Sequence, residues 1–562
     1  LADASTPLDR IALAMSALPE QEIWRRLVPA LSLFPEPARR ELAEAGQRDA
    51  PVELRPAIAI ALLHDPAPEA VSQVRELLGH EDPFVRGLAA RAMGVLGSGS
   101  LDLARLEPLF DDQPFPKSQA LAAAARLLGD GRAAPPAGWG AELLPGLEGA
   151  PGHPDVELAL CGLLSHYVFE PRVADALLAV AGGERGEAAR GEAIAALLRA
   201  GEPRAFDRLG ALVASRSPSA RLRAAALVGS AAWPLSSVGP LASLLERLLD
   251  DSDPGVRAVA LRALFARGDL LGRAQVVAWA QERRADPSPA VRAELYTGLV
   301  GRPWIGLDAL VETAGVRLER EPDAVARRQL VAALAARGAA ERLERGAIIA
   351  ILELVAEQDP SHLVRRRAAE ALRGFGRPAP DPRPVHALDQ LGAYRELEQR
   401  TSAPRTATLV TGRGEVVVRL ECPLAPKSCL SFLQLAAQGF FRDQVIGERD
   451  PGLAVRAGDP TGSGWGGPGY RLRDELTPLE LDRPGVLLLE RPFPDGASSR
   501  FELTLSPQPW RTGREVALGY VVAGLEVLDL LEPGDHIVDI RLDEGSPAES
   551  VHIPTGALPG RL

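Results

Sequence analysis

The chain has 562 residues, more than one hydrophobic core usually organises, so we expect several domains or an extended repeat array. Hydrophobic residues make up 46% and charged residues 25% of the sequence, which is typical of folded protein and excludes a largely disordered chain. The formal net charge of -12 argues against a nucleic-acid partner and against a surface built to coat a polyphosphate.

The scarce residue types narrow the possibilities further. The three cysteines and eight histidines are scattered without metal-ligand spacing, so we expect no metal site and no cofactor. No stretch of 18 uncharged apolar residues is present, and the sequence therefore predicts no membrane-spanning segment.

Basic charge comes almost entirely from arginine, a bias typical of a GC-rich, here bacterial, genome. A removed signal peptide is one explanation for a first residue, Leu1, that is not Met, and it favours the periplasm or envelope.

A turn followed by a helix recurs along residues 1–376. In its clearest copies Asp or Ser is followed by Pro, an apolar residue and Arg, as in 253–257 and 288–292. That arginine returns every 33 to 38 residues, at Arg190, Arg223, Arg257, Arg292, Arg327 and Arg365. Upstream copies at Arg55 and Arg86, and weaker ones near Ala120 and Glu157, bring the expected total to about ten units.

The unit has a simple physical basis. Asp or Ser caps the helix and Pro occupies its first turn, where a missing N–H costs nothing. Small alanines allow close packing, and stacked helix pairs complete a continuous core. The pattern resembles HEAT repeats, whose second helix opens with Asp-x-x-Val-Arg. This resemblance implies a ladder of Asp and Arg along the inner helices, so we interpret Arg257, Arg292 and Arg365 as structural.

The pattern changes after residue 376. Residues 377–384 are proline-rich and predict a stiff linker, followed by a short helix over about 386–399. Two alternating runs around a glycine turn at 407–420 predict a β-hairpin, and 425–439 predicts a helix.

The most specific motif in this region is the glycine-rich segment 458–470, followed by Asp474 and Glu475. It resembles the corresponding loop of cyclophilins, and supporting matches are Ala425, Pro426, Phe432, Gly439, Phe440, Phe441, Pro451, Gly452, Ser499, Phe501, Trp510 and Gly519. We therefore predict a multidomain chain with four parts: an all-α HEAT-repeat solenoid at 1–376, a Pro-rich linker with a short helix at 377–404, an all-β cyclophilin-like barrel at 405–545 and a C-terminal tail at 546–562.

The resemblance to cyclophilins implies a peptidyl-prolyl isomerase groove, but its residues are changed. The groove positions hold Glu448, Leu453, Ala454, Arg456, Glu490, Arg491, Arg500, Glu502 and Trp510. Glu448 stands where the family has its catalytic arginine, Glu502 replaces the phenylalanine of the proline pocket, and only Trp510 matches. We therefore expect no catalytic residue. Arg449 would point to the opposite face of its strand.

Two interpretations of the changed charges stay open: surface residues that have drifted, and an ion-pair network or charged recognition groove. The leading functional hypothesis is a non-catalytic protein-interaction scaffold that belongs to a larger assembly of proteins. The first alternative is an active isomerase, for which Arg449 must swing into the groove. The weakest is a regulator of a tetrapyrrole-bearing protein, since some bacterial HEAT-like proteins are lyases, but no acidic catalytic helix can be singled out.

Two cysteines are close in sequence, because Cys422 and Cys429 lie seven residues apart across a strand end and a first helical turn. We expect free thiols and leave a disulfide open; a bridge would favour a location outside the cytoplasm.

Overall fold

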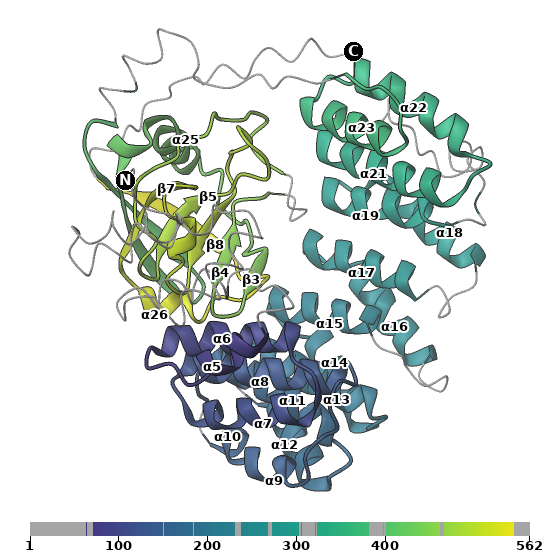
Figure 1. The fold of residues 1–562 in the computed structure, drawn as a ribbon. Helices are drawn as coiled ribbons and strands as arrows, with labels where there is room; N and C mark the ends of the chain where they lie inside the picture. The colour runs from purple at the N-terminus through teal and green to yellow at the C-terminus, as the bar shows by residue number, and fades with distance from the viewer. Residues whose placement is uncertain are drawn as a thin grey trace.

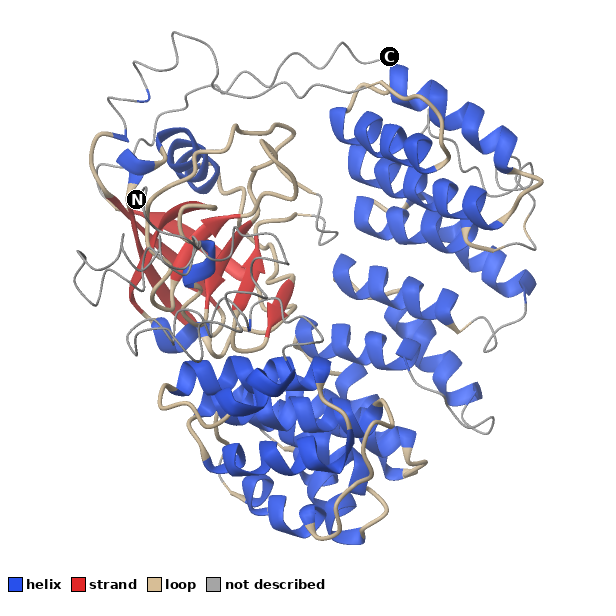
Figure 2. Ribbon diagram, viewed as in Figure 1, coloured by secondary structure: helices blue, strands red, loops and turns tan. Residues whose placement is uncertain are grey.

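The computed structural model confirms a helical region followed by a β-sheet domain (Figures 1 and 2). It describes residues 63, 71–149, 151–183, 185–230, 238–267, 273–302, 305, 321, 323–380, 397, 401–460 and 466–543. Within these ranges all regular structure up to residue 374 is helical, and the first strand begins at Arg405.

One helix of each repeat lies on the inner side of the helical array. The inner helices are α6 (Pro83–Leu96), α8 (Pro114–Gly129), α11 (Pro154–Leu164), α13 (Glu187–Arg199), α15 (Pro218–Ser230), α17 (Pro254–Ala266), α19 (Pro289–Val300), α21 (Ala324–Ala340) and α23 (His362–Gly374). Each packs on the next, which is the arrangement of a solenoid.

The outer layer consists of helices that alternate with the inner ones along the chain. They are α5 (Val71–Leu77), α7 (Gly99–Leu106), α9 (Trp139–Leu143), α10 (Pro145–Glu148), α12 (Pro171–Gly182), α14 (Arg204–Val213), α16 (Val238–Leu249), α18 (Arg273–Glu282) and α22 (Arg345–Gln358). The array curves from α5 through α15 to α23, and the sheet domain lies on the inner side of the curve (Figure 1). The total of about ten repeats stays a prediction, because residues 1–62 lie outside the described ranges.

The inner helices begin as the sequence predicts. Asp82 accepts the N–H of Phe84, Asp253 accepts that of Val256, and a proline occupies the first turn of both helices. These caps satisfy backbone donors that a helix leaves without partners.

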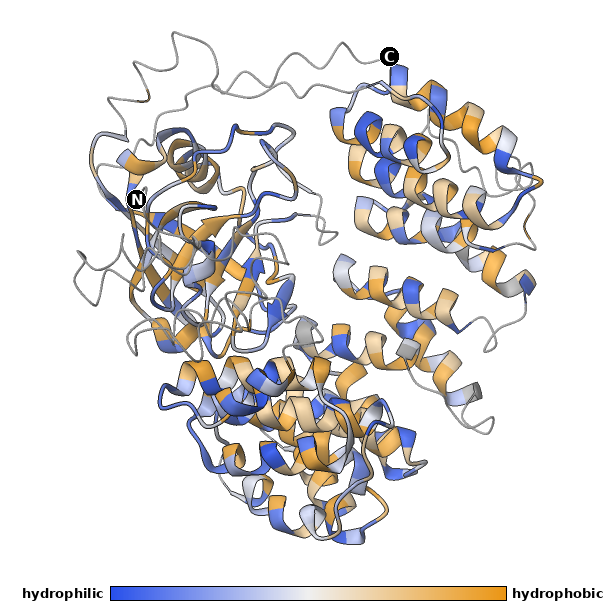
Figure 3. Ribbon diagram, in the orientation of Figure 1, coloured by the Kyte–Doolittle hydropathy of each residue, from blue (hydrophilic) through white to orange (hydrophobic). Residues whose placement is uncertain are grey.

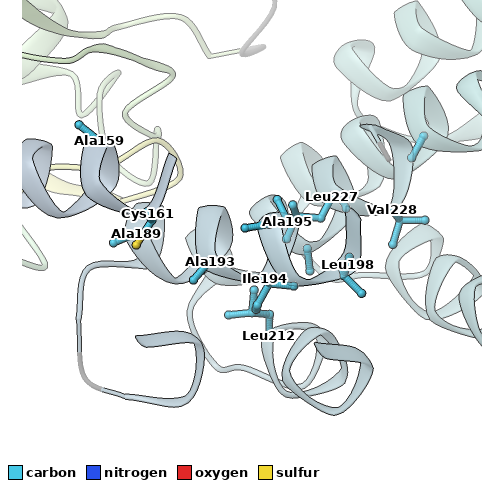
Figure 4. Close-up of a cluster of buried hydrophobic side chains, with 14 of the residues drawn as sticks. Ala159, Cys161, Ala189, Ala193, Ile194, Ala195, Leu198, Leu212, Leu227 and Val228 are labelled. Carbon is cyan, nitrogen blue, oxygen red and sulfur yellow. The ribbon is translucent and has the colours of Figure 1, made fainter. Parts of the chain in front are cut away.

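Small side chains let the inner helices approach each other closely. Figure 4 shows three residues of α13 at its contacts with neighbouring helices: Ala189 beside Cys161 of α11, Ile194 beside Leu212 of α14 and Ala195 beside Leu227 of α15, all buried. Apolar residues are spread along the whole array (Figure 3), so buried residues from Leu63 to Leu372 form one elongated core. Such a core depends on neighbouring repeats and not on one centre.

A ladder of ion pairs links successive repeats, as the HEAT resemblance implies. An arginine in one inner helix pairs with the acid before the next, at 2.6 to 2.9 Å, in Arg86–Asp112, Arg221–Asp251, Arg257–Asp286, Arg292–Glu321 and Arg327–Asp359. Each of these arginines also donates to a carbonyl six residues before it. One guanidinium therefore binds its own turn and the following one.

The marker at Arg223 is wrong. In α15 the ladder position is taken by Arg221, which pairs with Asp251 and donates to the carbonyl of Ser215. Arg223 lies two residues further along the helix, so its side chain leaves at a different angle.

The C-terminal domain is an eight-stranded sheet. Its strands are β1 (Arg405–Thr411), β2 (Gly414–Leu420), β3 (Glu448–Asp450), β4 (Ala454–Ala457), β5 (Val486–Leu489), β6 (Phe501–Thr504), β7 (Val516–Ala523) and β8 (Ile537–Leu542), with helices α25 (Pro426–Ala437) and α26 (Leu525–Leu528). The order is β3-β4-β6-β5-β7-β2-β1-β8, and all neighbouring pairs are antiparallel. The predicted hairpin is β1–β2 and the predicted helix is α25.

Three phenylalanines fill the core of this domain. Phe432 of α25, Phe441 and Phe501 of β6 have ring centroids 5.3 to 5.9 Å apart. All three belong to the motifs matched in the sequence, which shows that those motifs shape the domain. The helix predicted at 386–399, apart from residue 397, and part of the glycine-rich loop, 461–465, lie outside the described residues.

The expectation of free thiols at Cys422 and Cys429 is wrong, because the structure joins them as a disulfide. The short 3-10 helix Cys422–Leu424 turns back just before α25 and brings the two Cα atoms to 5.2 Å, within the usual span of a bridge. Cys161 is buried and free.

In the part of the chain that the structure describes, no helix is long and apolar enough to cross a membrane.

The ladder leads to a stability prediction. Arg257→Ala should lower the free energy of unfolding by about 1.5 to 3 kcal/mol, because it removes a charged hydrogen-bond pair that is mostly shielded from water. Thermal or urea unfolding would measure the loss.

Arg262→Ala is the matched control in the same helix. Arg262 pairs with Glu294, but its side chain is 65% exposed, so the cost should be about 0 to 1 kcal/mol. Equal losses for the two variants would contradict a structural role for the ladder.

Candidate functional site

The candidate groove contains a row of charges across three strands. Glu448 of β3 lies opposite Arg456 of β4, and Arg456 lies opposite Glu502 of β6. Residues directly opposite each other in antiparallel strands point to the same face, so acid, base and acid lie side by side. The register of β3, β4 and β6 therefore builds the centre of the site.

Arg456 is bound by three carboxylates. Its Nε lies 2.9 Å from Glu502 and 2.9 Å from Glu490, and a second nitrogen lies 3.5 Å from Glu448. Glu502 is buried, whereas the side chain of Glu448 is 61% exposed. The row thus runs from the interior of the domain to solvent.

Other charged residues extend this row into one connected network. Arg500 lies 2.7 Å from Glu490 and 3.8 Å from Glu448. Arg511, from the 3-10 helix Pro509–Arg511, pairs with Glu502 and with Glu515.

The network continues to the edge of the domain. Arg491 pairs with Asp474 at 2.9 Å and with Glu515 at 3.7 Å. We call this set, Glu448, Arg456, Asp474, Glu490, Arg491, Arg500, Glu502, Arg511 and Glu515, the groove network. It brings together every charged residue that the sequence assigned to the groove.

Burial and charge both act on the network. Burial raises the pKa of Glu490, although the guanidinium groups of Arg500 and Arg456 oppose the shift. Burial would lower the pKa of Arg456, but the carboxylates of Glu502 and Glu490 outweigh it and raise that pKa. The same balance, with Glu502 and Glu515, raises the pKa of Arg511. The arginines therefore stay charged, and their positions are determined by the acids around them.

The three uncharged positions of the groove differ in their surroundings. Ala454 is buried in β4, and Leu453 before it is half-buried. The carbonyl of Leu453 accepts hydrogen bonds from the Leu505 N–H at 2.7 Å and from Gln508 Nε2 at 2.8 Å. Trp510 packs with the core of the solenoid and not with the core of its own domain.

Arg449 lies on the opposite face from Glu448, as alternation along a strand predicts. Its guanidinium binds Asp155 of α11 at 2.9 Å and donates to the carbonyls of Leu528 and Leu531 at 3.1 and 3.0 Å. These contacts direct Arg449 away from the groove network.

Metal binding has no support from the described side chains, since no three or more His, Cys, Asp or Glu residues among them form a suitable cluster.

Sequence reasoning missed several residues of the site. Arg511 was not assigned, although it lies directly after Trp510 and pairs with Glu502. Asp155 and Phe84, both from the solenoid, contact Arg449 and Trp510. Contacts between distant segments leave no signal in local spacing, and only the contrast of Phe84 and Asp155 with the small residues at the same position in α15, α17 and α19 could have indicated them.

Comparison with known proteins supports both halves of the chain. Residues 406–553 match the family described as cyclophilin type peptidyl-prolyl cis-trans isomerase, and residues 40–128 match HEAT repeats. A peptidyl-prolyl cis-trans isomerase-like 1 of Aspergillus niger is 35% identical over 122 residues, which cover 21% of this chain and 75% of that protein.

A second curated protein and one solved structure are also similar to the C-terminal part of the chain. Peptidyl-prolyl cis-trans isomerase B of Streptomyces anulatus is 35% identical over 143 residues, covering 22% of this chain and 82% of that protein. A crystal structure of a Cryptosporidium parvum cyclophilin type peptidyl-prolyl cis-trans isomerase is 29% identical, with a TM-score of 0.24, and the match covers 25% of this chain and 98% of that one.

The protein thus combines N-terminal HEAT repeats with a C-terminal cyclophilin domain. Through that domain the chain belongs to the cyclophilin-type peptidyl-prolyl isomerase family.

The groove network leads to a second stability prediction. Glu502→Gln keeps the shape of the side chain but leaves Arg456 and Arg511 without their buried partner, so it should destabilise the domain by about 3 to 5 kcal/mol. Urea unfolding, followed by Trp fluorescence and circular dichroism, would measure the loss.

Glu415→Gln is the control from the same domain. Glu415 pairs with Arg541, and both side chains are 55% exposed, so we expect a change of about 0 to 1 kcal/mol. If Glu502→Gln were as mild as this control, the groove network would not be a stabilising element.

Proposed function

We propose that the protein is a non-catalytic interaction scaffold, in which the cyclophilin domain has kept its fold and lost its isomerase chemistry. The observation that carries this proposal is the buried carboxylate of Glu502, held between Arg456 and Arg511. Glu502 stands where cyclophilins have the phenylalanine of the proline pocket. A proline ring placed there would remove water from these charges without replacing their hydrogen bonds.

The position of the catalytic arginine supports the same conclusion. Rotation about a peptide bond has a barrier of roughly 18 to 20 kcal/mol, and cyclophilins lower it for X-Pro bonds through an arginine that stabilises the twisted bond. Glu448 stands at that position and its carboxylate cannot donate. The neighbouring cations Arg456 and Arg500 are engaged by carboxylates.

The alternative is that the domain remains an active isomerase. Membership of the family and the presence of Trp510 favour it. Activity would require a cation free to reach the substrate, and the candidate was Arg449. That side chain is bound to Asp155 and to two carbonyls on the other side of β3, so the alternative would need these contacts to break.

On the scaffold proposal, the partners of this chain are other proteins, and the chain is a subunit of a larger assembly. Repeat arrays offer extended surfaces and no preformed reaction site, and the described helices from α5 to α23 form such an array.

An activity measurement tests the proposal directly. The full chain should not accelerate cis-trans isomerisation of a proline peptide above the uncatalysed rate, because Glu448 cannot donate to the X-Pro bond and Arg456 and Arg500 are engaged by carboxylates. The assay follows the peptide after a jump from cis-enriched solvent, with an active cyclophilin as positive control. Glu448→Arg combined with Glu502→Phe should restore a slight rate if the sequence alignment is right.

A rate well above background would contradict the proposal, provided that Trp510→Ala abolishes it. That condition excludes a contaminating isomerase, because only the activity of this groove depends on Trp510.

A location outside the cytoplasm is also proposed, and the Cys422–Cys429 bridge supports it, since disulfides persist mainly in oxidising compartments. In protein purified from its own host and denatured under trapping conditions, one cysteine should react with an alkylating reagent before reduction and three after it. Three reactive thiols before reduction would contradict both the bridge and the proposed compartment.

A further inference from the structure

The face of the cyclophilin domain that carries Trp510 lies against the solenoid. Figure 1 shows β3 and α26 next to the N-terminal helices, and Arg91 of α6 pairs with Asp450 of β3 at 3.2 Å. The turn after β3 also reaches α8, where Gln119 donates to the carbonyl of Pro451 at 3.3 Å. These contacts join segments more than 300 residues apart in the chain.

We propose that the inner edge of α6, α8, α11 and α13 is a recognition surface for a cyclophilin-type domain, and that its occupant is the chain's own C-terminal domain. On this proposal the second residue of each of these four helices contacts the docked domain and determines whether it binds. The docked solenoid also covers the Trp510 end of the groove. The proposal goes beyond the scaffold function, because it would hold for an active or an inactive groove.

In four consecutive inner helices the second residue contacts the C-terminal domain. The second residues of α6, α8, α11 and α13 are Phe84, Phe115, Asp155 and Ala188. Each contacts the C-terminal domain through a different chemistry. Because the inner helices are stacked side by side, their second residues form a column along one edge of the solenoid.

The aromatic part of the column covers Trp510. The ring of Phe84 lies nearly parallel to that of Trp510, with the planes 6° and the centroids 6.3 Å apart, and it stacks on Phe115 at 5.4 Å. Phe115 in turn lies against Gly452, where a Cβ atom would come within 2.9 Å of the ring. Gly452 also has φ of +70°, so both its conformation and its contact require glycine.

The third position carries a buried charge pair. Both carboxylate oxygens of Asp155 lie 2.9 Å from Arg449, and one accepts the Gly452 N–H at 3.0 Å. The exposed fractions of the two side chains are 6% for Arg449 and 3% for Asp155. Arg449 uses its other nitrogen on two carbonyls, so the pair is fully hydrogen-bonded, the condition under which a buried ion pair defines one arrangement.

The fourth position binds through its backbone. Ala188 donates its N–H to Glu532 of the C-terminal domain at 2.8 Å, at a helix whose N-cap, Gly186, provides no side-chain cap. A Cβ atom on Gly186 would lie 2.9 Å from the same carboxylate. Glu532 therefore caps α13 from the other domain, as an N-cap residue would from within the helix.

The same position is small in the next three inner helices, α15, α17 and α19, and holds Val325 and Leu363 in the last two, α21 and α23. It holds Gly255 in α17 and Ala290 in α19, where the Pro and Arg around it are unchanged. Phe84, Phe115 and Asp155 are thus departures from a repeat that folds without them. Three such departures in consecutive repeats, all in contact with one domain, point to recognition of that domain.

The test uses the full chain with a protease site inserted in the proline-rich segment 381–384. After cleavage, the two parts should elute together in size-exclusion chromatography, because the contacts made by the second residues of α6, α8, α11 and α13 keep the domains bound to each other. The variant carries Phe84→Gly and Asp155→Ala, which introduce the residues found at the same position in α17 and α19. It should weaken association by roughly 100-fold or more, since it leaves Arg449 without its partner.

Arg262→Ala, on an exposed part of the solenoid, is the control and should leave association unchanged. Circular dichroism checks that each variant stays folded. If the double variant did not fold, Glu532→Ala in the other domain would take its place and should also weaken association, because α13 would lose its cap.

The proposal fails if the cleaved wild-type parts separate while both remain folded, or if the variants bind as tightly as wild type. Isomerase activity that appears only in the released variant would support the docking and contradict the loss of catalysis, so the two proposals can fail separately.

Discussion

Close stacking of the inner helices determines where the other surfaces of this protein lie, and the arginine ladder fixes that stacking from α6 to α8 and from α15 to α23. Each ladder arginine binds the turn before its own helix and the acid before the next, so it fixes the distance and the angle between repeats. Bidentate pairs between guanidinium and carboxylate groups define geometry as well as energy. Between α6 and α8 the Arg86–Asp112 pair holds the stack, and direct packing of the helices continues it through α11 and α13, so the second residues of these four helices form one column. Without that order, Phe84, Asp155 and Ala188 could not meet one domain together.

Alternation along β3 connects the two halves of the molecule. Glu448 and Arg449 are neighbours in sequence, but their side chains point to opposite faces. One joins the groove network and the other binds Asp155 in the solenoid. A shift of one residue in the register of β3 would exchange these roles and leave a buried carboxylate facing another acid. The register of this three-residue strand therefore controls both the groove and the interface.

Much of the fold could be predicted because its signals are local. The spacing of Arg257, Arg292 and Arg327 indicated the repeat, and the caps and prolines located the helix starts. The alternation in 407–420 indicated the hairpin. The error at Arg223 has a local cause too: α15 contains two arginines two residues apart, and only Arg221 projects toward Asp251. Spacing alone does not distinguish them.

The site was predicted less completely, and the reason is physical. The charged residues of the groove could be aligned one by one, but their mutual pairing depends on the register of β4 against β6 and on Arg511 approaching from a separate turn. The role of Asp155 depends on a domain that begins about 250 residues later in the chain. Cys422 and Cys429 needed the tight 3-10 turn between them, which the proline at 423 permits but does not require.

The groove network and the interface favour each other. An empty apolar groove beside a solenoid would expose hydrophobic surface wherever the two domains did not match in shape. Charges that pair among themselves within the groove avoid that cost, while Trp510, the one apolar groove residue of large area, is covered by Phe84. In an isomerase the same Trp must stay open to substrate. On the two proposals made here, a domain that serves as a ligand for its own solenoid has no such requirement, so selection would keep residues that shape the backbone, such as Gly452, and release those that would touch a proline.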